Sequence, residues 1–165
     1  MIRAFVATGQ LSNADDARLL GDVIIRRRDK VMSYWLTRTN PLDRFRVSSH
    51  LDGSRLDFDN AAIRLQFTHE PAAYDVAWSA LDNMTGATRE VLNHQTLTWP
   101  SLAIPMEALG PADASGSRYA VAIIRTHHTA FPEWQAPVVV TVRQRQGTID
   151  VVGIERGSGT LPVRK

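Results

Sequence analysis

The chain contains no cysteine, which excludes disulfides, thiolate nucleophiles and thiolate metal ligands together. It also has no apolar run near the roughly 20 residues that a bilayer-spanning helix needs. The Met1-Ile2-Arg3 start is not followed by the apolar core of a secretion signal. As written, the chain is expected in the cytoplasm, and an exported location is the alternative if it is part of a longer protein. The lack of cysteine fits any compartment.

Lysine is nearly absent as well, because arginine supplies 17 of the 19 basic residues. The formal net charge is only +2, and this surplus lies within residues 12–40. The run Arg26 to Lys30 fans around a helix at about 100° per residue and does not form one basic stripe. A solvated helix face is therefore the preferred interpretation, and weak nucleic-acid binding through this face is a second alternative function.

The known sequence signatures of catalysis are missing too. No GxGxxG, P-loop or nucleophile elbow occurs, and Ser158 lacks the spacing of a hydrolase serine. His69-Glu70 begins like a zinc-protease motif, but no second histidine follows at helical spacing. The sequence thus favours a protein that is not an enzyme, and we expect no cofactor.

The spacing of apolar residues changes at Asn40-Pro41. Before it, apolar residues recur at helical spacing and predict an amphipathic helix over 13–39, with Ser12 or Asn13 as cap. The predicted buried face consists of Ala17, Leu20, Ile24, Val31 and Trp35, broadened by Val23 and Tyr34. Ahead of the helix, the segment 4–7 is apolar and is either strand or helix.

After Pro41 the period becomes two, which is typical of β-strands. Asp52-Gly53 predicts a hairpin turn, and Gln146-Gly147 predicts another. Further strands are expected over 63–69, 74–78, 96–104, 118–126, 137–145 and 149–154, of which 118–126 and 137–145 are the strongest, with a surface loop over 108–117. The fold class is therefore mostly β (α+β): an antiparallel sandwich-like or half-open barrel region over 43–155, with the long helix packed on it. We expect one domain over 1–156 and a flexible tail over 157–165.

The loop between the two strongest strands, Thr126 to Pro137, carries the best ligand-binding candidates. It holds Phe131, Glu133 and Trp134. Trp99 lies beside a proline in another loop, where an exposed indole can stack on a sugar or a protein partner. The competing interpretation for both tryptophans is packing at the edge of the core, which is the commoner role.

The same loop begins with two adjacent histidines. A metal-dependent hydrolase-type site built from His127, His128 and Glu133 is the first alternative function. Neighbouring residues of an extended strand point to opposite faces, so the two imidazoles are not expected to share one metal.

Several segments of the chain resemble the C-terminal region of a group of large, uncharacterised bacterial proteins. These segments are 6–10, 15–20, 26–31, 40–45, 58–62 and 82–86. The resemblance implies a module that follows a longer N-terminal portion, and it implies no catalytic residues. The sequence as a whole predicts a non-catalytic accessory or binding module, with a protein or carbohydrate ligand and the remainder of a longer chain as its partners.

Overall fold

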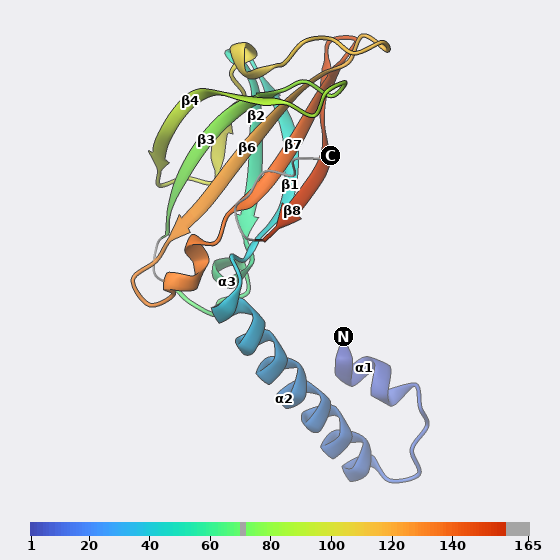
Figure 1. Ribbon diagram of the computed structural model, residues 1–165. Helices are drawn as coiled ribbons and strands as arrows, with labels where there is room; N and C mark the ends of the chain where they lie inside the picture. The colour runs from blue at the N-terminus through green and yellow to red at the C-terminus, as the bar shows by residue number, and fades with distance from the viewer. Residues whose placement is uncertain (70–71, 158–165) are drawn as a thin grey trace. The chain divides into compact units, whose positions relative to one another are not determined.

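The computed structural model describes residues 1–69 and 72–157, apart from the side chains at positions 93 and 94 (Figure 1). The chain divides into two compact units, Met1–Thr37 and Arg38–Lys165, which are described separately. Most of the predicted tail over 157–165 lies outside the described residues. Strand accounts for 42% of the structure and helix for 27%, so the mostly β fold class with two antiparallel sheets and one long N-terminal helix is confirmed.

The N-terminal unit consists of helix α1 (Ile2–Ala7) and most of helix α2 (Ala14–Arg38). The bounds of α2 agree with the predicted 13–39 to within one residue. The side chain of Asn13 accepts a hydrogen bond of 2.9 Å from the amide of Asp15 and satisfies one free donor of the first turn. The segment 4–7, which the sequence left open, belongs to a helix.

Helix α1 contacts α2 at Gly21. The Arg3 guanidinium lies 2.8 Å from the Asp22 carboxylate. Gly21 is buried, and a Cβ atom at this position would lie 3.4 Å from Cγ of Arg3. The glycine therefore marks a close packing contact between the two helices.

The prediction that the apolar stripe of the long helix is buried is wrong. Leu20 is 43% exposed, Val31 51% and Trp35 58%. The physical reason lies in the size and place of α1. It is only six residues long and meets α2 at Gly21 and Asp22, on a different side of the helix from Leu20 and Val31.

The second unit contains two antiparallel sheets. The three-stranded sheet has the order β1 (Leu42–His50), β2 (Gly53–Asn60), β5 (Ser101–Ala103). The five-stranded sheet has the order β4 (Thr88–Leu97), β3 (Ala73–Leu81), β6 (Arg118–His127), β7 (Val138–Arg145), β8 (Thr148–Arg156). Both predicted hairpins are present: His50 pairs with Gly53, and Arg145 pairs with Thr148.

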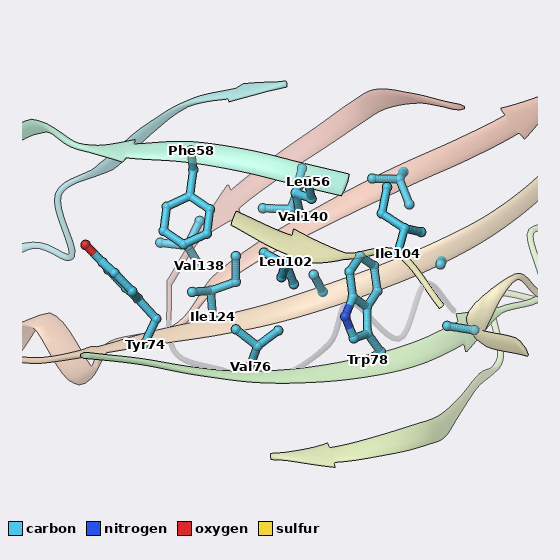
Figure 2. Close-up of a cluster of buried hydrophobic side chains, with 14 of the residues drawn as sticks. Leu56, Phe58, Tyr74, Val76, Trp78, Leu102, Ile104, Ile124, Val138 and Val140 are labelled. Carbon is cyan, nitrogen blue, oxygen red and sulfur yellow. The ribbon is translucent and has the colours of Figure 1, made fainter. Parts of the chain in front are cut away.

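Side chains from the inner faces of the two sheets form one hydrophobic core, as Figure 2 shows. Phe58 from β2 meets Tyr74 from β3 edge to face, with ring centroids 5.1 Å apart. Trp78 is 2% exposed, and Ile124 and Val140 are fully buried. Alternation along each strand therefore buries one face against the opposite sheet, the arrangement of a β-sandwich.

The strand predicted over 63–69 does not form. Instead, Ala61–Arg64 makes a short helix, α3. The Asn60 side chain accepts hydrogen bonds from the amides of Ala62 at 3.0 Å and Ile63 at 3.3 Å. This cap starts a helical turn at the end of β2, and it overrides the alternating pattern that follows.

The sequence predicted one strand over 96–104 and did not predict most of β4. Two strands occupy this region, and the chain bends between them at Trp99 and Pro100. The 3-10 helix η1 (Met106–Ala108) follows, and the predicted surface loop over 108–117 is only partly exposed, since Leu109 and Ser117 are buried.

Candidate functional site

The predicted ligand-binding loop folds onto the protein. It contains the 3-10 helix η2 (Pro132–Gln135), and Trp134 is fully buried. The Trp134 ring stacks on Phe131 at 4.6 Å and lies 4.8 Å from the His128 ring. Phe131 also lies 6.0 Å from Phe67. The indole is the centre of an aromatic cluster that attaches this loop to the sheet, so for Trp134 the competing interpretation, packing in the core, is the one that the structure has.

The two adjacent histidines have different neighbours. The His127 Nε2 atom lies 2.7 Å from an oxygen of Asp75 on β3, whose other oxygen accepts a hydrogen bond of 2.7 Å from Thr96. His128 belongs to the aromatic cluster, and its Nδ1 atom accepts a hydrogen bond of 3.1 Å from the Ala130 amide. The strand geometry thus separates the two imidazoles, as the alternation of side chains predicts.

The other two candidates remain on the surface. Glu133 is exposed, and Trp99 is 75% exposed between β4 and β5. The aromatic cluster consists of Phe67, His128, Phe131 and Trp134 and does not include Trp99. Within the described parts of the chain, no three His, Asp or Glu side chains are placed to hold a metal ion together. The candidate residues from the sequence therefore do not form one site.

A groove of the β unit lies elsewhere, beside the turn after β3. It is a groove of about 570 Å³ that runs from one end of β3 and β6 to Thr141 in the middle of β7 and on to Glu155 near the end of β8. It is lined by Leu81, Asn83, Met84, Thr85, Gly86, Tyr119, Thr141, Val152, Gly153 and Glu155. Apolar side chains and side chains that can form hydrogen bonds both line it.

The turn over 82–87 forms one wall of the groove and is fixed by Asp82. Its carboxylate accepts hydrogen bonds from the Met84 amide at 2.9 Å and the Thr85 hydroxyl at 2.8 Å. These bonds, first that from the Thr85 hydroxyl, lower the pKa of Asp82 below its ordinary value. Gly86 completes the turn at φ +74°, a conformation that side-chain-bearing residues rarely adopt. The wall is thus largely preformed.

A second aspartate fixes the aromatic side chain of the groove. Asp113 accepts hydrogen bonds from the Ser115 hydroxyl at 2.7 Å and the Ser117 amide at 3.0 Å. Its other carboxylate oxygen accepts a bond of 3.2 Å from the Tyr119 hydroxyl. These bonds, with the Ser115 hydroxyl as the largest contribution, lower the pKa of Asp113 to about 2. The Tyr119 ring is therefore held in place at the groove.

The pairing of β7 with β8 changes register at the floor of the groove. Thr141 pairs with Gly153, but the next residue, Val142, pairs with Val151, so Val152 is an extra residue in β8. A Cβ atom on Gly153 would lie 3.5 Å from the Thr141 side chain. Because Gly153 has no side chain, the groove stays open beside Thr141. A glycine inside a strand pattern is a signal of a bulge or a close approach, and it is the sequence signal that could have located this groove.

Charged groups gather on the three-stranded sheet. Asp59 lies 3.7 Å from Arg44, 3.8 Å from Arg46 and 3.4 Å from Arg64. The Asp57 carboxylate accepts a hydrogen bond of 2.6 Å from Ser101. The carboxylates of Asp57 and Asp59 belong to an ion-pair network that joins strands β1 and β2 to α3.

No family model, no curated protein and no solved structure matches this chain. No helix in the described residues is both long and apolar enough to cross a membrane.

Proposed function

We propose that this chain is a non-catalytic binding module whose ligand is a carbohydrate bound in the groove on the five-stranded sheet. The observation that supports this proposal is the mixed lining of the groove around a low glycine floor. Sugars present C–H faces beside hydroxyl groups, so they suit a surface on which apolar and polar groups alternate.

Specific side chains would take each part of such a ligand. The Tyr119 ring and Met84, which is 70% exposed, offer apolar contact to a sugar face. Thr141 and Glu155 offer a hydroxyl and a carboxylate to sugar hydroxyl groups. Because Gly153 has no side chain, it leaves room for a sugar ring between these side chains.

The groove is built on strands and on a hydrogen-bonded turn, which favours binding without a large ordering cost. Asp82 and Asp113 fix the two segments that carry Met84 and Tyr119. Preorganisation of this kind reduces the conformational entropy lost on binding.

The test is binding of the purified chain to an array of defined oligosaccharides, followed by titration calorimetry with each sugar that binds. Gly153→Val adds a side chain to the groove floor and should reduce affinity at least tenfold. Gly157→Val is the matched control, because a Cβ atom at Gly157 has no neighbour within 4 Å. Absence of binding to any sugar, or equal affinity of the two variants and the parent chain, contradicts the proposal.

The accessory role within a longer bacterial protein is part of the same proposal and derives from the sequence resemblance. A continuous upstream reading frame that joins this segment to a larger N-terminal portion would support it. A stop codon directly upstream of Met1 would contradict it.

A further inference from the structure

The lining of the groove on the five-stranded sheet contains a single charged residue, Glu155. The Glu155 side chain is exposed on β8. Among the described residues, no basic group lies within ion-pair distance of its carboxylate. The groove therefore offers a carboxylate that has no counter-charge in the folded chain.

A second negative charge lies behind the opposite end of the groove. The Asp113 carboxylate accepts hydrogen bonds from the Tyr119 hydroxyl at 3.2 Å and from the Asn83 side-chain nitrogen at 3.4 Å. Both of these donors belong to residues that line the groove. Hydrogen bonds, first that from the Ser115 hydroxyl, lower the pKa of Asp113 to about 2, so its carboxylate is ionised at neutral pH.

The basic residues near this end do not cancel these charges. The Arg143 guanidinium lies 2.7 Å from the Asp150 carboxylate, so this pair adds no net charge. Arg89 and Arg118 line a separate hollow, together with Asp82. A concave site bordered by charges of one sign concentrates ions of the opposite sign, so the groove favours a cationic ligand.

The two negative charges lie at the ends of a diagonal across the sheet. Tyr119, which binds Asp113, pairs with Arg143 of β7, whereas Glu155 pairs with Val139 of the same strand from its other side. Tyr119 and Glu155 are thus two strands apart and four β7 residues apart along the sheet, a Cα separation of roughly 16 Å. This length favours a chain of linked sugars over a single ring.

We infer that the groove selects oligosaccharides that carry free amino groups, and that Glu155 determines this specificity. The inference rests on the proposed carbohydrate-binding function and adds the charge of the ligand. An ammonium group beside the Glu155 carboxylate forms a charge-assisted hydrogen bond, whereas an acetylated amine does not. The Tyr119 ring provides a face on which a cationic group is also favoured.

The experiment compares three oligosaccharides of equal length and linkage by titration calorimetry: a glucosamine oligomer, its N-acetylated form and a glucose oligomer. The glucosamine oligomer should bind at least fivefold more tightly than the other two at low salt. Glu155→Gln should reduce this preference to at most twofold. Glu107→Gln is the matched control, because Glu107 is exposed on η1 and does not line the groove, and it should leave the preference unchanged. Added salt should also reduce the preference, since it screens the ionic attraction.

The outcomes separate this inference from the proposed function. Equal affinity of the parent chain for all three oligomers overturns the inference and leaves carbohydrate binding in place. A preference that Glu155→Gln does not change overturns the assigned role of Glu155. Absence of binding to any of the three, and to the acidic and neutral sugars of the array, overturns the inference together with the proposed function.

Discussion

The hydroxyl of Thr126 donates a hydrogen bond of 2.7 Å to the side-chain oxygen of Asn40, and both residues are buried. The side-chain nitrogen of Asn40, Nδ2, donates a hydrogen bond of 2.9 Å to the backbone carbonyl of Ala136. Asn40 therefore joins the segment before β1 to the end of β6 and to the residue after η2. Pro41 disfavours helical geometry at Asn40, and these bonds hold the resulting extended conformation in the β unit.

Asn40→Ala should lower the free energy of unfolding by about 1–3 kcal/mol, because it leaves the buried Thr126 hydroxyl and the Ala136 carbonyl without their partner. Thr126→Val removes the hydroxyl that donates the bond to Asn40, with little change in side-chain shape. Urea denaturation of both single variants and the double variant gives the coupling between them. Strictly additive losses would show that the 2.7 Å bond does not contribute.

Gly110→Ala should be strongly destabilising, because a Cβ atom at this position would lie 2.1 Å from the Leu81 carbonyl oxygen. Relief of this overlap requires movement of backbone, and overpacking of this kind costs about 1–3 kcal/mol or more. Gly157→Ala is the control, since its Cβ meets nothing within 4 Å. Thermal denaturation distinguishes the two, and a melting temperature of the Gly110 variant equal to that of the control would contradict the close packing.

Trp134→Ala should cost about 3–5 kcal/mol of stability, since it removes a fully buried indole from the aromatic cluster. Trp99→Ala should change stability by no more than about 0.5 kcal/mol, because its ring is 75% exposed. Chemical denaturation followed by circular dichroism makes the comparison. If the Trp134 variant is as stable as the Trp99 variant, the loop does not pack as described.

The stability advantage of the parent chain over Asp113→Asn should depend on pH. The pKa of Asp113 is about 2 in the folded chain, below the ordinary 3.8. A lowered pKa stabilises the folded chain above pH 3.8, and this contribution is lost as the pH falls through 2. The difference in unfolding free energy between the two chains should therefore shrink between about pH 4 and pH 2. A difference that is constant over this range, or a carboxyl resonance of Asp113 that titrates near pH 4, would contradict the hydrogen-bonded loop.

Local signals explain which elements the sequence could predict. The α2 helix, the hairpin turns at Gly53 and Gly147 and the strands β3, β6, β7 and β8 each combine a clear period with a turn or cap residue. Residues 63–69 also alternate, yet the Asn60 cap begins a helix there. Alternation alone could not reveal this competition, because the cap acts on the backbone and not on the apolar pattern.

The site was less predictable because it depends on long-range contacts. Trp134 lies in a loop between prolines, where the sequence left exposure and packing both open, and the contacts of its ring with Phe131 and His128 belong to packing. The groove brings together residues from Leu81 to Glu155 through strand pairing. Its floor depends on the extra residue Val152, a register change that no local pattern specifies.

Register changes also occur on the opposite border of the five-stranded sheet. Between Val76 and Ser79 of β3, the partner strand β4 contains two extra residues, and β8 contains one at Val152. Both outer strands are thus irregular, and irregular outer strands are poor templates for the addition of another strand. The sheet should therefore resist edge-to-edge aggregation during expression and storage. Deletion of Val152, which would straighten one border, should increase thioflavin-positive aggregates on prolonged incubation.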